Sequence, residues 1–496
     1  MKTVWGISAN SHDAGLAVLK HGFKGLTDKP NLTLLFASHS ERFSKIKNDP
    51  HLSQDMVDYA LEKFGYPREI VWYEKPFKKT LRQYFAGQGW NSNENNIKEY
   101  LNRYGIDAPI SYVDHHRSHA AGGFYTSPYR DATVVVIDAI GEFATTTIWQ
   151  AEGTSLTKRF TKRFPHSLGL FYSAMTQRVG LTPNEDEYIL MGMAAYGNPN
   201  RLYYEMHNDF FKDKSKVFAL TQNLHRGCKG WRPDLTTEQD MYDIAAATQK
   251  IYEMYFAEIL IKAKYTLPSN NLVISGGCAL NCSANAKALY HYDNIWIMPN
   301  PGDAGSALGS VLAKHNMHIK WNGPYLGYNI PGPYPVKEII DELLKTGICG
   351  VANGPAEYGP RALGNRSLLA DPRRADIKDK VNEIKRRQRF RPFAPAVLSE
   401  YTQDLFSAYT GPYMQFTAPC TQADKYPAIV HVDGTSRVQT VGVNDNPGFR
   451  LLLEEWHKQT GCPMLLNTSL NIKGQPIVNN LTDAEKFATM YNVKVY

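Results

Sequence analysis

Two histidines four residues apart, His115 and His119, are the residues in this chain best spaced for metal chemistry. They lie in the stretch DHHRSHAAGGFY, and if this stretch opens a helix, positions i and i+4 bring both imidazoles onto one face. Two neutral imidazoles on one face can hold a divalent metal ion when a third ligand arrives from elsewhere. Asp303, in a turn between a strand-like segment and a helix of small residues, is the expected third ligand. The alternative is that Asp303 only caps the helix that follows it.

Basic residues concentrate in the C-terminal third of the chain. Residues 372–391 contain nine lysines and arginines against three acids. Arg361 and Arg366 stand among glycines just upstream, and Asn467 and Asn471 follow in LLNTSLN. Arginine forks match phosphate geometry, so this pattern suggests a polyphosphate pocket. The alternative is a solvated charged face.

A third candidate is the turn in NNLVISGGCALN, where a buried strand runs through two glycines into a helix. Backbone N–H groups at such a turn are free to meet a phosphate. Gly276, Gly277 and Asn281 are the candidate contacts there.

The elements that must position these residues form a repeated pattern. Segments 3–8, 15–20 and 32–40 read as hairpin-connected strands, followed by a helix near 52–64 and a strand at 70–73. Strand, turn and strand recur from residue 133, with a third strand expected near 157–164. Three such strands, a helix and a strand form the half-domain of the actin and sugar-kinase architecture.

In that architecture the turns after the first strand of each half face each other across a nucleotide cleft. One turn carries His12 and Asp13, and the other carries Asp138, Gly141 and Glu142.

Helical periodicity marks residues 166–181 and 238–264, and a helix over 336–346 ends at Gly347. Residues 184–197 are expected to be a loop in which Gly192 and Gly197 admit close backbone approach. Residues 200–235 are basic and aromatic with little periodicity, as in a substrate lid or a solvated insertion. Residues 323–336, rich in Gly, Pro and Tyr, are expected to be a domain linker.

Length and composition indicate a globular enzyme. The 496 residues predict two domains, with 43% hydrophobic and 21% charged residues. No apolar run reaches the roughly 18 residues of a membrane span, and the N-terminus lacks a signal-peptide core, so a cytoplasmic protein is expected. The six cysteines are expected to be reduced, and Cys278 and Cys282 lack the second pair of a zinc ribbon. The net charge of +7 is compatible with anionic ligands or nucleic acid.

Together these motifs resemble the O-carbamoyltransferase family of nodulation-factor, cephalosporin and tobramycin carbamoyltransferases. The resemblance runs in order from residue 6 to residue 477. The matching stretches are GISANSHDAG, ERFSKIKND, DHHRSHA, HSLGLFYSA, EYILMGMAAYG, ISGGCALN, NPGDAGSALG, EYGPRALGNRS, RFRPFAP and LLNTSLNIKGQPI.

The resemblance implies an α/β protein of two domains. An actin-like N-terminal domain (ASKHA, a duplicated ribonuclease-H-like fold) would span residues 1–325 and hold the metal and carbamoyl-transfer site. A YrdC-like α/β domain would span residues 335–496 and process carbamoyl phosphate and ATP to a carbamoyl-adenylate. The carbamoyl group would then pass to an acceptor hydroxyl in the N-terminal domain.

The resemblance also assigns residues. It implies that His115, His119 and Asp303 hold iron, manganese or magnesium, with Asp138 as an accessory acid. The expected contacts to carbamoyl phosphate and ATP are Arg361, Lys385 and Arg391, joined by Arg366, Asn467 and Asn471.

The chemistry is consistent with this assignment, because adenylation gives carbamate a good leaving group and arginines neutralise the phosphates. The acceptor hydroxyl needs a general base, and His12 is the candidate, with Lys47 orienting the carbamoyl group. The alternative for His12 is a role in capping its turn.

Two departures from the family stand out. Ile189 occupies a position where the family usually has lysine, which removes an expected phosphate or acceptor contact. The chain also ends soon after GQPIV, which predicts a YrdC-like domain without its last helices.

The acceptor is not specified by these motifs. Compact length, basic charge and the insertion at 200–235 favour 5-hydroxymethylcytosine or 5-hydroxymethyluracil in DNA, as in a phage enzyme acting in a bacterial host. Activity on DNA would fall steeply with salt, and the target base would have to leave the stack. The alternatives are an antibiotic or sugar hydroxyl, threonylcarbamoyl-adenosine synthesis on transfer RNA, and a non-catalytic nucleotide-binding scaffold. The expected partners are small-molecule co-substrates, DNA and a second copy in a homodimer, and no membrane.

Overall fold

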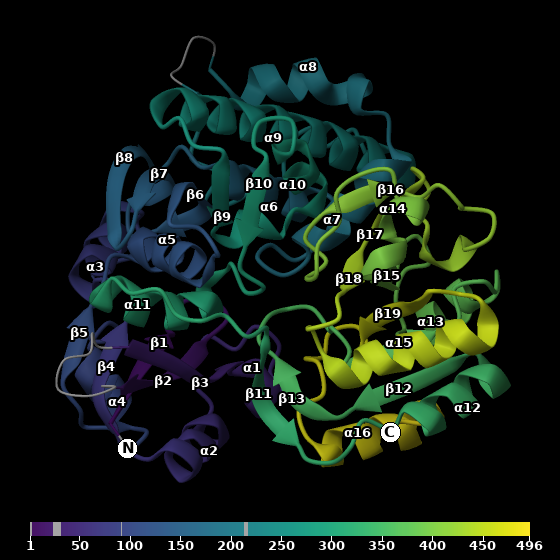
Figure 1. The fold of residues 1–496 in the computed structure, drawn as a ribbon. Helices are drawn as coiled ribbons and strands as arrows, with labels where there is room; N and C mark the ends of the chain where they lie inside the picture. The colour runs from purple at the N-terminus through teal and green to yellow at the C-terminus, as the bar shows by residue number, and fades with distance from the viewer. Residues whose placement is uncertain (1, 23–30, 91, 213–216) are drawn as a thin grey trace. The chain divides into compact units, whose positions relative to one another are not determined.

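The structure is a computed structural model that describes residues 2–22, 31–90, 92–212 and 217–496. The chain divides into two units. Figure 1 colours the chain by residue number, from purple at the N-terminus to yellow at the C-terminus. The first unit comprises residues 1–44 and 48–322, and the second comprises residues 45–47 and 323–496. The predicted boundary near residues 325–335 stays a prediction.

The first sheet of the first unit has the strand order β3-β2-β1-β4-β5. β1, β2 and β3 pair antiparallel, and β4 and β5 join in parallel. All six residues of β1 are buried, as its apolar sequence TVWGIS requires of a central strand. The strands are Thr3–Ser8 (β1), Gly15–Gly22 (β2), Asn31–His39 (β3), Pro67–Trp72 (β4) and Ile110–Tyr112 (β5).

The second sheet repeats this plan with the order β10-β9-β6-β7-β8. Three antiparallel strands are again followed by two that run parallel to the first. The repeat expected from the sequence is therefore present in strand order and direction. The strands are Asp131–Gly141 (β6), Ala144–Glu152 (β7), Ser155–Arg163 (β8), Asn271–Ser275 (β9) and Asn294–Ile297 (β10).

Two helices, α5 (His115–Thr126) and α11 (Ser306–His315), pack against each other between the sheets (Figure 1). Their small residues allow this close approach: a Cβ on Gly309 would lie 2.0 Å from the Ser118 carbonyl oxygen. α11 also packs on β1, since a Cβ on Gly6 would lie 1.8 Å from the Ala307 carbonyl oxygen. This packing brings the residues before and within α5 close to those before α11.

The other helices of the first unit confirm the helices expected near 52–64, 166–181 and 238–264. They are Glu41–Ser44 (α1), Gln54–Phe64 (α2), Pro76–Phe85 (α3), Ile97–Asn102 (α4), Leu168–Arg178 (α6), Glu187–Met193 (α7), Pro199–Phe210 (α8), Glu238–Thr266 (α9) and Cys282–Ala288 (α10), with 3-10 turns at Ala194–Tyr196, Gly277–Leu280 and Asp303–Gly305.

Two of these helices correct the sequence analysis. α7 and α8 lie where a loop and an aperiodic insertion were expected. α8 buries Leu202, Met206 and Phe210, a stripe spaced by four, which the surrounding tyrosines and charges obscure in the sequence. Gly197 faces α9 and admits no ligand there, because a Cβ would lie 2.0 Å from the Tyr242 carbonyl oxygen.

The second unit is built on a five-stranded sheet of order β12-β14-β19-β15-β18, with small two-stranded sheets β11-β13 and β16-β17. Its core is one continuous apolar cluster that includes Leu368, Val397 and Trp456. The strands are Tyr325–Ile330 (β11), Ile348–Ala352 (β12), Gly354–Glu357 (β13), Arg366–Ala370 (β14), Ala394–Leu398 (β15), Thr417–Pro419 (β16), Thr435–Arg437 (β17), Gln439–Val441 (β18) and Met464–Ser469 (β19).

The helices of this unit include the expected one over 336–346, which ends at Gly347 in the left-handed region. They are Val336–Thr346 (α12), Ile377–Ile384 (α13), Thr402–Leu405 (α14), Pro447–Thr460 (α15) and Leu481–Tyr491 (α16), with 3-10 turns at Ser399–Tyr401 and Pro427–Ile429.

The predicted linker at 323–336 is wrong over much of its length. Residues Tyr325–Ile330 form β11, which pairs antiparallel with β13. The β-forming residues of YLGYNI outweigh the flanking glycines and prolines. At the other end of the unit, Ala352 N–H donates to the Tyr496 carbonyl oxygen at 2.7 Å, so the final residues bond to β12.

Within the described residues, the helices are too short or too polar to cross a membrane. All six cysteines are free thiols in the structure.

Candidate active site

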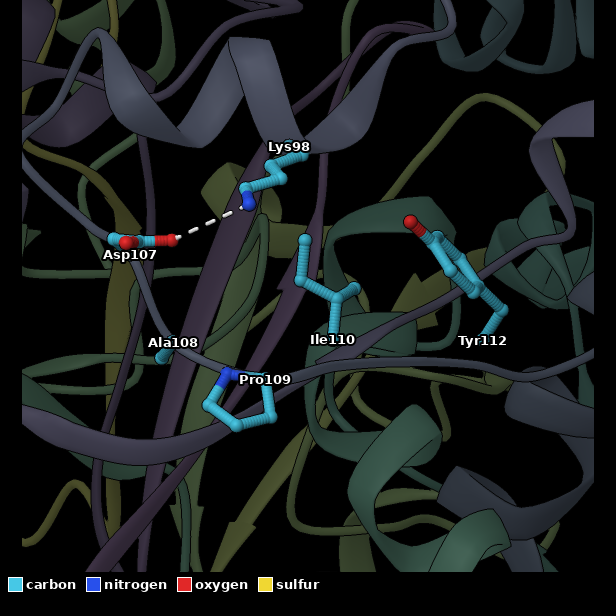
Figure 2. Close-up of a pocket in the computed structure, with 6 residues that line it drawn as sticks. All are labelled: Lys98, Asp107, Ala108, Pro109, Ile110 and Tyr112. Atoms are coloured by element: carbon cyan, nitrogen blue, oxygen red, sulfur yellow. Dashed lines mark ion pairs between the residues drawn. The ribbon is translucent and has the colours of Figure 1, made fainter.

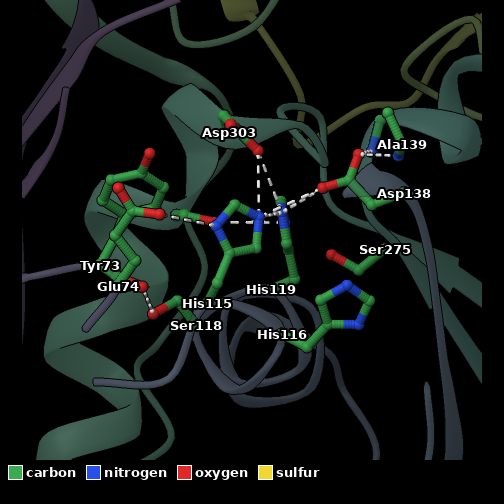
Figure 3. Close-up of polar contacts among 12 residues, drawn as sticks. Tyr73, Glu74, His115, His116, Ser118, His119, Asp138, Ala139, Ser275 and Asp303 are labelled. Atoms are coloured by element: carbon green, nitrogen blue, oxygen red, sulfur yellow. Dashed lines mark hydrogen bonds and ion pairs between the residues drawn. The ribbon is translucent and has the colours of Figure 1, made fainter. Parts of the chain in front are cut away.

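Four buried side chains from three separate segments of the first unit meet at one point (Figure 3). His115 and His119, one turn apart on α5, face each other with their Nε2 atoms 3.1 Å apart. Asp138 Oδ2, at the end of β6, lies 3.2 Å from His115 Nε2 and 3.3 Å from His119 Nε2. Asp303 Oδ1 lies 3.4 Å and 3.2 Å from the same two nitrogens. We call these four residues the His/Asp cluster.

The cluster has the donor set and spacing of a metal site. Its four ligand atoms all lie within 4.8 Å of one another. Metal–ligand bonds of about 2.1 Å in a tetrahedron place adjacent ligands about 3.4 Å apart, close to the spacings given above. Asp303 Oδ1 is buried and accepts no hydrogen bond from the described residues, although it faces two imidazoles. An acceptor in that position fits a cation, so these residues could hold a metal ion.

Asp138 lies as close to both imidazoles as Asp303 does, so it is an equal member of the cluster. The family resemblance implied instead that Asp138 is an accessory acid. Asp303 does not cap α11, since no side-chain cap hydrogen bond forms at that helix or at the 3-10 turn before it.

Opposite charges compensate one another inside the cluster. Burial acts to lower the pKa of His115, but Asp303 and Asp138 outweigh it and raise this pKa well above its usual value. Burial acts to raise the pKa of Asp303, but His115 and His119 hold this pKa well below its usual value. The fold therefore keeps two carboxylates ionised in a buried site, where nearby positive charge and hydrogen-bond donors stabilise them.

Further polar groups orient the imidazoles. Ser306 Oγ lies 3.1 Å from His119 Nδ1, and Glu74 Oε2 lies 3.7 Å from His115 Nδ1. The Ala139 N–H donates to Asp138 Oδ1 at 2.9 Å. A hydrogen bond such as that of Ser306 fixes the ring orientation and the tautomer of a ligand, whereas Glu74 lies beyond hydrogen-bond distance of His115 Nδ1. Sequence reasoning missed Glu74, because its place before α3 gives no sign that it reaches α5.

His116 turns away from the cluster although it lies between the two ligands in sequence. Its Nδ1 lies 2.9 Å from Thr147 Oγ1, and burial followed by the charge on His115 lowers its pKa well below the usual value. His116 is therefore a neutral, structural histidine.

His12 lies at the edge of the cluster and is the exposed histidine there. Its Nε2 lies 3.9 Å from Asp303 Oδ2, and its side chain is 44% exposed against 5% for Asp303. The turn that carries it is fixed by Asp13, whose Oδ1 lies 2.9 Å from His39 Nδ1, and His39 Nε2 lies 2.8 Å from Asn300 Nδ2. His12 is thus held beside the cluster but open to solvent.

Lys47 lies in residues 45–47, which group with the second unit. Its expected role beside His12 stays a prediction.

The turn at Gly276 and Gly277 supports Asp138. Gly276 has a φ of +90°, and a Cβ there would lie 2.2 Å from the Ile137 carbonyl oxygen. The Gly277 N–H donates to Asp138 Oδ1 at 3.4 Å. Asn281 caps α10 by accepting from the Ala284 N–H at 3.0 Å. The phosphate contacts expected at this turn stay predictions.

In the second unit, Arg366 is fully buried and its guanidinium is committed to backbone carbonyls. A side chain so engaged holds loops together and has no face left for a phosphate, unlike the role expected from the sequence. Its acceptors are the carbonyl oxygens of Tyr328, Asn353, Gly354, Asn365 and Asn479.

Lys385 and Asn471 lie together at the end of β19. Lys385 Nζ donates to the carbonyl oxygen and the Oδ1 of Asn471, both at 2.9 Å. Burial lowers the pKa of Lys385 well below its usual value, and Arg387 and Arg391 add to this shift. Asn467 is buried and donates to the Ala362 carbonyl oxygen at 3.2 Å, beside Arg361. Arg361 and Arg391 are half-buried.

Glu357 is a further residue of this region that sequence reasoning did not single out. Its Oε1 accepts from the N–H groups of Leu363, Asn365 and Arg366 at 2.7, 2.8 and 3.2 Å. This carboxylate shapes the loop that carries Arg361. In the sequence, Glu357 could have been singled out as the glutamate that begins the stretch EYGPRALGNRS.

A separate surface hollow lies beside the edge strand β5 (Figure 2). Lys98 and Asp107 form an ion pair of 3.9 Å at its rim. No residue of the His/Asp cluster is among those that line it, which are Lys98, Asp107, Ala108, Pro109, Ile110 and Tyr112.

Comparison with known proteins identifies the family. Residues 73–312 match the family model described as carbamoyltransferase N-terminus, and residues 340–496 match carbamoyltransferase C-terminus. Nodulation protein NolNO of Sinorhizobium fredii is 31% identical over 91% of this chain and 74% of its own length. The chain belongs to the carbamoyltransferase family.

Two other relatives match this carbamoyltransferase over more than 90% of both chains. The uncharacterized protein sll1178 of Synechocystis is 32% identical, over 98% of this chain and 94% of its own. The 3'-hydroxymethylcephem-O-carbamoyltransferase of Amycolatopsis lactamdurans is 27% identical over 91% of both chains. The protein is therefore an enzyme that transfers a carbamoyl group.

Among solved structures, a ROK family protein from Streptococcus pneumoniae covers 63% of this carbamoyltransferase and 99% of its own chain. Its TM-score of 0.34 and identity of 11% are too low to define the fold.

Proposed function

We propose that this carbamoyltransferase uses carbamoyl phosphate and ATP to form a carbamoyl-adenylate and passes the carbamoyl group to an acceptor hydroxyl. The observation that carries this proposal is the position of His12, an exposed base at the edge of a buried cluster that fits a metal ion. A proton acceptor beside a cation site suits attack by a hydroxyl on an acyl-like carbon.

The folds proposed for the two units are actin-like and YrdC-like. The equal strand order of the two sheets in the first unit supports the actin-like assignment. The YrdC-like assignment rests on the sequence resemblance.

The first stage would take place in the second unit. Carbamoyl phosphate would react with water to give carbamate and phosphate. A carbamate oxygen would then attack the α-phosphorus of ATP and displace pyrophosphate, forming the carbamoyl-adenylate. Arg361 and Arg391 are the candidates for binding these anions, because guanidinium groups neutralise phosphate charge. Lys385, expected in the same role, is buried and donates to Ser469 and Asn471 instead.

The second stage would take place beside the His/Asp cluster. The acceptor oxygen attacks the carbamoyl carbon and AMP leaves, while His12 Nε2 accepts the hydroxyl proton. Asp303 Oδ2, 3.9 Å away, stabilises the resulting imidazolium. A divalent ion bound by the cluster would supply Lewis-acid stabilisation of the charge that develops during this attack. Two imidazoles and two carboxylates favour iron or manganese over magnesium, which prefers oxygen ligands.

The acceptor we favour is the hydroxymethyl group of 5-hydroxymethylcytosine or 5-hydroxymethyluracil in DNA. The net charge of +7 supports a polyanionic partner. The relative named 3'-hydroxymethylcephem-O-carbamoyltransferase supports a hydroxymethyl acceptor in general, and equally supports the second candidate, an antibiotic or sugar hydroxyl.

The test is mass spectrometry of hydroxymethylcytosine DNA, hydroxymethyl-dCMP and an aminoglycoside panel, each incubated with the protein, ATP, carbamoyl phosphate and a divalent metal. A gain of one carbamoyl group on DNA supports the favoured acceptor. Carbamoylation of an aminoglycoside supports the second candidate. Absence of AMP release with every acceptor contradicts the two-stage chemistry.

A further inference from the structure

α3 presents an exposed aromatic face close to the proposed active site. Phe77, Tyr84 and Phe85 are 68%, 57% and 68% exposed, and their spacing of seven and eight positions places them on one side of the helix. Trp90 follows the helix and is 54% exposed, with its ring centroid 6.1 Å from that of Tyr84. We call Phe77, Tyr84, Phe85 and Trp90 the α3 aromatic face. Large aromatic side chains grouped in solvent indicate a binding surface.

This face is continuous with the His/Asp cluster through the turn between β6 and β7. The Phe85 ring lies 6.4 Å from the ring of Phe143, which follows that turn. Two residues earlier, Gly141 packs on a cluster ligand so tightly that a Cβ would lie 2.2 Å from His115 Cδ2. A ligand on the aromatic face would therefore extend toward the proposed reaction centre.

The same region is fixed to the turn that carries His12. Lys79, on the buried side of α3, donates from Nζ to the Asn10 carbonyl oxygen at 2.6 Å. Asn10 Nδ2 donates in turn to the Glu94 carbonyl oxygen at 3.3 Å, shortly after Trp90. α3 and the segment after it thus adjoin both sides of the proposed site.

Positive charge gathers beside the aromatic face. Arg226 lies beside the residues that follow α3, since a Cβ added to Gly87 would lie 3.5 Å from Arg226 Nη2. Arg82, on α3, donates to Gln88 Oε1 at 3.0 Å. Burial lowers the pKa of His225, and the nearby charges of Arg82 and Arg226 lower it further. Arg226 is exposed and forms no ion pair with any residue that the structure describes.

Two acidic groups of this region, Asp114 and Glu142, are paired with lysines, whereas Glu94 is exposed. Asp114 Oδ2 lies 3.2 Å from Lys75 Nζ, and Glu142 Oε2 lies 3.4 Å from Lys78 Nζ. The charge of Arg226 therefore remains available to an anionic ligand.

We propose that the α3 aromatic face and Arg226 bind a single strand of DNA next to the base that carries the acceptor hydroxyl. This inference rests on the proposed function. Exposed aromatic rings with an adjacent cation form the usual platform for unpaired nucleotides, because bases stack on ring faces and phosphates meet the cation. The rings of Tyr84, Phe85 and Trp90 meet edge to face, at interplanar angles of 69° and 73°. Phe77 and Phe85 are separated by eight residues of helix, or about 12 Å at 1.5 Å per residue, which suits several nucleotides.

The test is fluorescence anisotropy of the full chain with a fluorescein-labelled single-stranded oligodeoxynucleotide, repeated at several salt concentrations. Tyr84→Ala and Trp90→Ala are each expected to weaken binding about tenfold or more. Arg226→Ala is expected to weaken binding and to reduce the slope of log affinity against log salt by about one.

Matched controls are Tyr265→Ala, a tyrosine 88% exposed at the end of α9, and Arg103→Ala on the surface. Both are expected to bind DNA as the unaltered chain does. Equal affinity of the Tyr84, Trp90 and Arg226 variants would overturn the inference.

Two further outcomes separate this inference from the proposed function. If the chain carbamoylates hydroxymethyl-dCMP but does not bind DNA, the proposed chemistry stands and this inference fails. Light scattering that shows a dimer, reduced to a monomer by Tyr84→Ala, would assign the face to a second copy and also overturn it. Absence of AMP release and of any carbamoylated product would contradict both proposals.

Discussion

His12 Nε2 lies 3.9 Å from Asp303 Oδ2, while the other oxygen of the same carboxylate lies 3.2 Å from His119 Nε2. One buried carboxylate thus joins an exposed histidine to the buried pair. The arrangement places a proton acceptor and a cation site on opposite sides of Asp303.

Substitution of the exposed histidine is expected to separate the two proposed stages. His12→Gln should reduce carbamoyl transfer about 100-fold or more, because general-base catalysis of this kind contributes at least that much. ATP–pyrophosphate exchange should stay unchanged. His51→Gln is the control, since His51 contacts the same turn through Asn10 Oδ1 at 3.3 Å but lies outside the cluster. Equal loss in both variants would remove the specific role of His12.

Removal of an imidazole is expected to weaken metal binding at the cluster. His119→Ala should lower the affinity for Mn²⁺ or Fe²⁺ about 100-fold or more, since it removes one of four donors. Metal content after equilibrium dialysis, measured by mass spectrometry, checks this. His116→Gln is the neighbouring control and should retain metal. Full metal content in His119→Ala would contradict the assignment.

Because Glu74 and Lys79 form a buried ion pair, we expect their substitutions to have strongly non-additive effects on the free energy of unfolding. Glu74 Oε1 lies 2.6 Å from Lys79 Nζ, and both side chains are about 95% buried. Glu74→Gln leaves an uncompensated buried ammonium and should lower the free energy of unfolding by about 3 kcal/mol. The double variant with Lys79→Met should recover part of this loss in urea unfolding. A double variant less stable than the sum of the singles would contradict the pairing.

Two arginines of the second unit are expected to behave differently. Arg366→Met should lower the melting temperature sharply, because it leaves several buried carbonyl oxygens without their donor. Arg391→Ala should lower the melting temperature less than Arg366→Met does and raise KM for ATP or carbamoyl phosphate. The reverse pattern would assign the structural role to Arg391.

The ion pair of Glu400 and Arg450 is expected to make a pH-dependent contribution to the free energy of unfolding. Arg450 donates to both oxygens of Glu400 at 2.7 and 2.8 Å and lowers the pKa of Glu400 to about 2. Because the folded pKa is below the unfolded value of about 4.3, this contribution is present above that value and disappears as pH falls toward 2. Glu400 is half-exposed, so solvent limits the contribution to about 1 kcal/mol or less. Glu400→Gln should be less stable than the unaltered chain at pH 7, and this difference should shrink at pH 3.

Features that depend on local spacing could be predicted from the amino-acid sequence alone. The i, i+4 pair of His115 and His119, the strands of both halves and the long helix α9 follow from side-chain periodicity along one segment. The turn that ends in Asp303 could be placed because a strand and a small-residue helix flank it. The ordered motifs also sufficed to indicate the family.

Only the tertiary structure decided which distant groups meet. Glu74 reaches His115 because the segment after β4 lies against α5, where Ser118 Oγ donates to the Tyr73 carbonyl oxygen at 2.8 Å, and no local pattern encodes that contact. Arg366 reads as a phosphate ligand in its glycine-rich stretch, but it is surrounded by carbonyl oxygens from segments up to 113 residues away. Buried polar groups must find partners wherever the fold places them, so their roles depend on packing between segments.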